Sequence, residues 1–328
     1  MFSRPTVFVM GAGASYELGF PLGEDLKVEI GELLNILFPN GREQSSGDYQ
    51  IASLLKQRAA QNGEHNWNYL LYKAWQIRDA LPGALSIDNV LDAHHSDPDL
   101  VYCGKLAICK SILLAEKKSK LYGDRRPHDP TIFQRVSGTF LIPLFQMLTE
   151  GVRKEELSGS LENLSIITFN YDRSIERFFP EALATYYGID QTLAAEIFGS
   201  VKIIHPYGQV GALGWEDRDS VPYGGDDANL SSITDRIRTF TEGIVDENLQ
   251  SDIHNAYFGA DTVVYLGFAF HPINLELLTG TGSGKANRVV GTAYGLAKPA
   301  RDVAEDLVLQ SLGKTDVGSH LESTEDFW

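Results

Sequence analysis

The chain has 328 residues, of which 43% are hydrophobic, so it can form a large core in one large or two modest domains. Its 28 basic and 44 acidic residues give a formal net charge of −16, which disfavours direct binding to nucleic acids. No apolar run is long enough to predict a membrane span, no signal-peptide pattern follows Met1, and the two cysteines, Cys103 and Cys109, are too few for a four-thiolate zinc ribbon. We therefore expect a cytoplasmic protein with buried free thiols, and no direct contact with nucleic acid or membrane.

The first predicted element is a buried strand of a parallel sheet at residues 6–10, followed by a glycine-containing turn at residues 11–15. Small residues in such a turn let a phosphate approach the backbone N–H groups at a helix N-terminus, as in dinucleotide-binding units. Tyr16 occupies the third glycine position of the dehydrogenase fingerprint, and no acidic residue ends a second strand about 20 positions later. The pattern indicates a nucleotide cradle rather than a hydride-transfer site, with a simple tight turn as the alternative.

A long helical block follows the first strand and turn. Gly19, Phe20 and Pro21 predict a loop beside the turn, and apolar spacing predicts a helix over about residues 26–37. From residue 49 to residue 152 helical patterns recur without a convincing strand, and Ser86 has the position of an N-cap. Roughly 100 helical residues are too many for one crossover connection. Residues 39–159 are therefore predicted as an inserted helical module that covers one wall of the site.

Sheet patterns return in the second half of the chain, with strands predicted at 164–169, 201–204, 262–266 and from 288 onward. Helices are predicted over 231–257 and 300–312, a mobile loop over 206–229, and a loose acidic tail over 314–328. The glycine-rich stretch 279–285 lacks P-loop spacing and is interpreted as a flexible loop. The predicted fold is α/β, a Rossmann-like parallel sheet with helices on both faces and a large helical insertion after the first βα unit. Its core consists of residues 1–38 and 160–313 of a single domain.

Polar residues follow two of the later strands where those strands end. Asn170 and Asp172 come directly after the strand at 164–169, and His205 follows the strand at 201–204. In open α/β sheets the ligand lies outside the carboxyl ends of the strands, so these side chains are expected beside the glycine turn. Each has a simpler alternative: Asn170 as a helix cap, Asp172 as a charge in the first helical turn, and His205 as a hydrogen-bonded surface residue.

These landmarks, in this order, resemble the sirtuin superfamily, and more closely its prokaryotic sirtuin-like NAD hydrolases from antiphage defence. The resemblance rests on Gly11, Ala12, Gly13, Ala14 and Ser15 with Gly19-Phe20-Pro21, on Thr168-Phe169-Asn170-Tyr171-Asp172, on His205, and on Leu266-Gly267-Phe268 leading to Asn274. It implies a catalytic pair of Asn170 and His205. It also implies a pyrophosphate site at the glycine turn, and further NAD contacts from Pro21, Thr168, Asp172, Gly267, Phe268 and Asn274.

The sequence departs from deacylating sirtuins, and these departures favour NAD cleavage. It has no zinc ribbon, Pro206 follows His205, and Leu22-Gly23-Glu24 stands where the family's arginine loop is expected. We expect hydrolysis of NAD, the substrate, to nicotinamide and ADP-ribose without a metal. His205 is expected to act as the general base, Asn170 to orient the ribose hydroxyls or water, and Asp172 to fix the geometry.

The resemblance further implies an effector subunit of a bacterial antiphage system, as a homo-oligomer or with a separate partner such as a motor ATPase. Three alternatives stay open: a sirtuin-type deacylase or ADP-ribosyltransferase, a non-catalytic NAD-sensing regulatory subunit, and a mainly structural subunit of a defence assembly.

Overall fold

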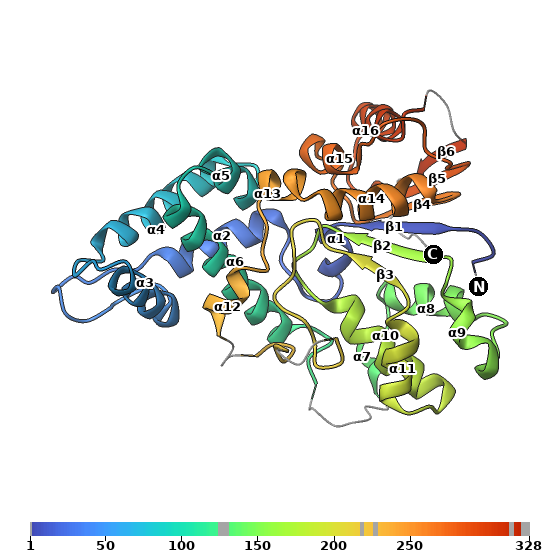
Figure 1. The fold of residues 1–328 in the computed structure, drawn as a ribbon, viewed down its shortest axis with the longest axis horizontal. Helices are drawn as coiled ribbons and strands as arrows, with labels where there is room; N and C mark the ends of the chain where they lie inside the picture. Colours follow the sequence, from blue (N-terminus) through green and yellow to red (C-terminus); the bar gives the residue numbers. More distant parts are fainter. Residues whose placement is uncertain (1, 124–130, 217–219, 226–228, 315–317, 323–328) are drawn as a thin grey trace.

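The computed structural model describes residues 2–123, 131–216, 220–225, 229–314 and, for the backbone alone, 318–322 (Figure 1). Six strands form one sheet, and every neighbouring pair of strands is parallel. The strands are β1 (Thr6–Met10), β2 (Leu164–Thr168), β3 (Lys202–Ile204), β4 (Thr262–Leu266), β5 (Arg288–Thr292) and β6 (Gly318–Glu322).

The strand order is β3-β2-β1-β4-β5-β6, which is the order of dinucleotide-binding folds. Chain progression runs outward from β1 in both directions, so the order reverses between β1 and β4. Ligands of open α/β sheets bind outside the carboxyl ends of the strands at such a reversal. The topology confirms the predicted Rossmann-like α/β fold and directs attention to the ends of β1 and β4.

Helices account for most of the remaining described residues. They are α1 (Ala12–Tyr16), α2 (Gly23–Leu34), α3 (Tyr49–Gln61), α4 (Asn68–Ala80), α5 (Ile87–Ala93), α6 (Pro98–Lys118), α7 (Ile132–Arg135), α8 (Leu141–Thr149), α9 (Leu157–Ser160), α10 (Ser174–Tyr187), α11 (Gln191–Phe198), α12 (Leu230–Thr234), α13 (Phe240–Val245), α14 (Glu247–Gly259), α15 (Pro272–Leu278) and α16 (Lys298–Ser311), with short 3₁₀ turns at Leu81–Gly83 and Lys154–Glu156.

The central strand β1 is buried on both faces, which explains its unbroken apolar sequence. Val7 and Val9 belong to one hydrophobic core, shared with α14 and α16, because alternate side chains of a strand point to opposite faces. Phe8 and Met10 belong to the second core, shared with α8 and α10. Figure 1 shows these two helical layers on either side of the sheet. The predicted helices on both faces are thereby confirmed.

The elements described between β1 and β2 are all helical or 3₁₀. In Figure 1 the group α2–α6 lies beyond the end of β1, beside the carboxyl edge of the sheet. The predicted N-cap of α5 forms, since the Ser86 side chain accepts a hydrogen bond from the Asn89 backbone. Cys103 and Cys109 are buried free thiols on α6, as predicted. The boundaries of an inserted module, 39–159, stay a prediction.

Three predictions about the second half need correction. The single helix predicted over 231–257 is three helices, because Thr239 and Asp246 cap new helices and Ile237 forms a β-bridge with Gly208. The predicted loose tail contains β6, which pairs with β5, while 315–317 and 323–328 lie outside the described residues. The predicted mobile loop 206–229 is largely buried from Pro206 to Leu213, and 217–219 and 226–228 fall outside the described part. Residues 123–130, whose polar sequence predicts a turn, also lie mostly outside the described part.

No helix in the described ranges is long and apolar enough to cross a membrane.

Candidate functional site

The glycine turn packs directly against the backbone that follows β4. Gly11 and Gly13 donate their N–H groups to the carbonyls of Leu266 and Gly267, both at 3.0 Å. A Cβ on Gly13 would lie 2.8 Å from the Gly267 Cα, a contact shorter than real Cβ atoms essentially ever make. Gly267 itself has a φ of +56°, and its Cβ would lie 2.0 Å from the Ala14 nitrogen. The close approach of the two backbone segments therefore explains why glycine occupies these positions.

This packing also uses amide groups that a phosphate would need. The Gly13 N–H is bonded to Gly267, and the Ala14 N–H donates to the Gly11 carbonyl at 3.0 Å. The predicted pyrophosphate site at residues 11–15 must therefore rely on other groups of the turn. Ala12, at the start of α1, is exposed on this turn, and Gly13 is partly exposed.

Asn170 joins the end of β2 to the glycine turn. Its Nδ2 donates to the Gly11 carbonyl at 3.1 Å and to Ser15 Oγ at 2.9 Å. A carbonyl can only accept, so the contact with Gly11 fixes which end of the amide is nitrogen. The Asn170 backbone N–H is held by Thr168 Oγ1 at 3.2 Å. The Oδ1 atom of this half-buried side chain is thus the acceptor left for a ligand.

Ser15 and Asp172 continue this hydrogen-bond chain. Both side chains are buried, and Ser15 donates to Asp172 while it accepts from Asn170. Asp172 Oδ1 also accepts from the Ser174 N–H at 3.0 Å, at the start of α10. Burial raises the pKa of Asp172, although these hydrogen bonds oppose the shift. Asp172 therefore holds the glycine turn and α10 together from inside the protein.

Both ring nitrogens of His205 have partners within the chain. Nδ1 lies 3.1 Å from the Asn170 carbonyl oxygen, and Nε2 lies 2.8 Å from Glu176 Oε1. Burial alone would lower the pKa of His205, but the Glu176 carboxylate and the Asn170 carbonyl raise it above its usual value. The Asn170 carbonyl can only accept, so Nδ1 donates to it, and an Nε2–H group that donates to the Glu176 carboxylate gives the ring its second proton. His205 lies beside Asn170 as predicted, without a free lone pair in this arrangement.

The remaining predicted residues form a more apolar wall. The Phe268 ring lies 5.2 Å from that of Phe169, measured between centroids, and Phe169 packs against Tyr207 at 5.8 Å. Asn274 Oδ1 accepts from the Tyr207 hydroxyl at 2.7 Å. No hydrogen bond or ring contact among the described residues joins Pro21, half-buried ahead of α2, to this group.

Sequence reasoning missed three contributors. Glu176 on α10 pairs with His205, and its only sequence signal is that it lies one helical turn after Asp172. Tyr171 donates a short hydrogen bond to Asp88 on α5, which ties the helical group to the end of β2. Thr292 Oγ1 accepts from the Gly267 N–H at 2.8 Å. No local pattern could identify Asp88 or Thr292 as neighbours of these strand ends.

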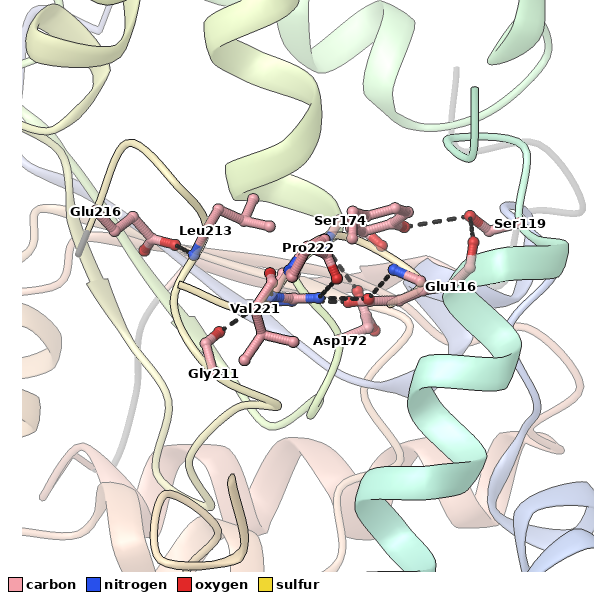
Figure 2. Close-up of polar contacts among 12 residues, drawn as sticks. Glu116, Ser119, Asp172, Ser174, Gly211, Leu213, Glu216, Val221 and Pro222 are labelled. Carbon is pink, nitrogen blue, oxygen red and sulfur yellow. Dashed lines mark hydrogen bonds and ion pairs between the residues drawn. The ribbon is translucent and has the colours of Figure 1, made fainter. Parts of the chain in front are cut away.

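A buried ion pair holds the segment that follows β3. Arg173 and Glu116 have no exposed side-chain surface, and their closest atoms, Nη2 and Oε2, are 2.6 Å apart. Arg173 also donates to the carbonyls of Val221 at 2.6 Å and Pro222 at 3.2 Å. Figure 2 shows Val221 and Pro222 beside Glu116, with the Leu213–Glu216 contact of the same segment nearby. The segment is therefore anchored to α6 through Arg173.

A groove of about 1130 Å³ lies next to this segment. Its walls come from α10, α11, β3 and residues 213–216 and 222–223, and we call it the α10–α11 groove. None of the lining residues belongs to the glycine turn, but Glu176 does line it. The groove and the glycine turn are thus separate sites linked by a chain of contacts, from Glu176 to His205, from His205 to Asn170 and from Asn170 to Gly11.

Within the described ranges, no three or more His, Cys, Asp or Glu side chains gather closely enough to hold a metal ion. In comparisons with known proteins, no family model matches the chain and no curated protein matches it. The sirtuin-like resemblance therefore rests on the sequence motifs alone.

Proposed function

We propose that the protein is a NAD glycohydrolase that cleaves NAD to nicotinamide and ADP-ribose. The observation that carries this proposal is that Asn170, at the end of β2, is bonded to Gly11 and Ser15 of the turn after β1, next to the β1–β4 reversal of a Rossmann-like sheet, with its Oδ1 left as an acceptor. An acceptor at this edge suits the hydroxyl groups of a nucleotide ribose. The sirtuin-like motifs are the reason that we propose NAD and not another nucleotide as the substrate.

In the proposed reaction the nicotinamide–ribose bond breaks and water adds to the ribose carbon. Asn170 orients a ribose hydroxyl or the attacking water through Oδ1. The buried Asp172 fixes Ser15 and the glycine turn, so that the substrate is held in one orientation. His205 takes a proton from the water. To do so, the ring must first lose the proton on Nε2, the nitrogen that contacts Glu176, while Nδ1 keeps its contact with the Asn170 carbonyl.

The test is nicotinamide release from NAD by purified protein, wild type beside Asn170→Ala. Loss of Oδ1 and of the contacts to Gly11 and Ser15 is expected to reduce the rate by about 10²-fold or more. Asn255→Ala, at an exposed position of α14, serves as the matched control and is expected to keep the wild-type rate. Full activity in a folded Asn170→Ala protein would refute the assignment of this residue.

A second candidate, a nucleotide-sensing subunit without turnover, is favoured by one specific observation. Both nitrogens of His205 and both protons of the Asn170 amide are engaged within the chain. An arrangement so fully hydrogen-bonded suits binding better than proton transfer. Saturable NAD binding in calorimetry, with no nicotinamide formed in the same sample, would select this candidate.

The role as effector of an antiphage system, alone as a homo-oligomer or with a motor ATPase, rests on the resemblance alone. Adding candidate partners to the nicotinamide assay tests it, because a trigger is expected to raise the rate.

A further inference from the structure

The α10–α11 groove is large enough for a small organic molecule and is separate from the glycine turn. Its volume of about 1130 Å³ is slightly above the usual range of small-molecule pockets. Aromatic and acidic side chains line it together, among them Trp215, Tyr223, Glu216 and Glu176. Such a combination is typical of sites for organic cations.

Glu176 gives the groove a buried hydrogen-bond acceptor that has no donor. Its side chain is 2% exposed, and Oε1 is bonded to His205 at 2.8 Å. The second oxygen, Oε2, is buried and has no hydrogen-bond partner among the described residues. A buried carboxylate oxygen without a donor is unfavourable, so a donor supplied by a ligand would be bound strongly there.

Glu216 adds a second carboxyl group. It lines the same groove as Glu176, and desolvation together with the negative charge of Glu176 raises the pKa of Glu216. The nearby arginines are already paired. Arg177 lies 2.7 Å from Glu181, and Arg173 lies 2.6 Å from Glu116. The groove therefore has an excess of negative charge, in a protein whose net charge is already −16.

We propose that the α10–α11 groove binds a small organic cation with N–H donors, an alkylammonium or guanidinium group, held between Glu176 and Glu216. The body of the ligand lies against the half-buried Trp215, whose ring is supported edge-on by Phe198 at a centroid distance of 6.3 Å. N–H donors are required because the oxygen to be satisfied is a hydrogen-bond acceptor. Because Oε2 is buried, a ligand reaches it only after neighbouring side chains move.

Binding at this site has a consequence for His205. A cation beside Glu176 repels the imidazolium ring and shares the carboxylate that now stabilises it, so it lowers the pKa of His205. A neutral His205 is the form needed as a general base. This consequence rests on the proposed NAD cleavage, whereas the binding does not.

The probe for the binding test is agmatine, which carries a guanidinium and an ammonium group, titrated into the NAD-free protein by calorimetry. We expect saturable binding at one site, at least tenfold weaker in Glu176→Gln, since a hydrogen bond to a charged group is lost. Trp215→Leu is expected to bind several-fold more weakly. Glu276→Gln, an exposed position on α15 outside the groove, is the control and should bind as the wild type does.

The neutral molecule 1,4-butanediol, of similar length, should not bind. If Glu176→Gln fails to fold, as judged by circular dichroism, Glu216→Gln and Trp215→Leu decide the question. Equal binding of agmatine to wild type and these variants, equal binding of the neutral molecule, or no binding at all would each overturn the proposal. Because no NAD is present, none of these results depends on nicotinamide release, which is measured separately.

Discussion

Removing the charge of Glu116 is expected to destabilise the protein strongly. Its carboxylate accepts from Arg173 Nε at 2.9 Å and Nη2 at 2.6 Å, and from the Gly224 N–H at 2.8 Å. Burial alone would lower the pKa of Arg173, but the charge of Glu116 raises it, so the guanidinium stays charged. Glu116→Gln keeps the shape of the side chain and leaves that guanidinium buried without a counter-charge. Breaking a buried ion pair in this way costs about 3–5 kcal/mol.

The assay is urea unfolding, followed by circular dichroism, of wild type and Glu116→Gln. Asp252→Asn is the matched control. It removes the partner of Lys202 from an ion pair just as short, 2.6 Å, but with side chains 41% and 54% exposed. Its expected cost is within about 1 kcal/mol, because solvent screens such pairs. A loss below about 1 kcal/mol for Glu116→Gln would refute the inference that a desolvated charge pair anchors the segment after β3.

Two further predictions concern the strand ends. His205→Gln should reduce the free energy of unfolding most below about pH 6.5, and this loss relative to wild type should vanish as the pH rises through the raised pKa of folded His205. Urea unfolding of both proteins at about pH 5.5 and about pH 9 measures the loss. An equal loss at both pH values would contradict the prediction. Gly267→Ala should cost about 2 kcal/mol or more, because its Cβ would lie 2.0 Å from the Ala14 nitrogen. Gly31→Ala, in the middle of α2 with no atom within 4 Å of the added Cβ, should instead raise stability by about 0.5–1 kcal/mol, and the same unfolding assay compares the two glycines.

The fold was largely predictable because its signals are local. A short apolar run between turn residues predicts a buried strand, and β4 begins and ends where the sequence predicts. The break within 231–257 was missed because helical spacing continues across it. Ile237 forms a bridge with Gly208 between α12 and α13, and the N-caps Thr239 and Asp246 begin α13 and α14. β6 was missed because its pattern is polar, and its pairing with β5 is a tertiary interaction.

The site was predictable only as far as the parallel sheet brings strand ends together. That rule predicts Asn170 and His205 as neighbours, and the Asn170 carbonyl does meet His205 Nδ1. The rule gives no partner for a side chain. Glu176 is 29 residues from His205 in sequence, and Glu116 is 57 residues from Arg173, so neither pairing leaves a periodic trace. These long-range pairs determine the charge of the imidazole and the position of the segment after β3.

The two proposals meet at Glu176. In the structure this carboxylate raises the pKa of His205 and so favours the doubly protonated imidazole, which cannot accept a proton from water. A glycohydrolase with this arrangement is therefore at rest until something weakens the Glu176–His205 contact. The unsatisfied Oε2 is where a cation in the α10–α11 groove would do so, without touching the nucleotide. Agmatine is therefore expected to raise the rate of nicotinamide release in the wild type. At concentrations too low to saturate the groove of Trp215→Leu, it is expected to leave the rate of that variant unchanged. Equal stimulation of both proteins would show that the groove does not control His205.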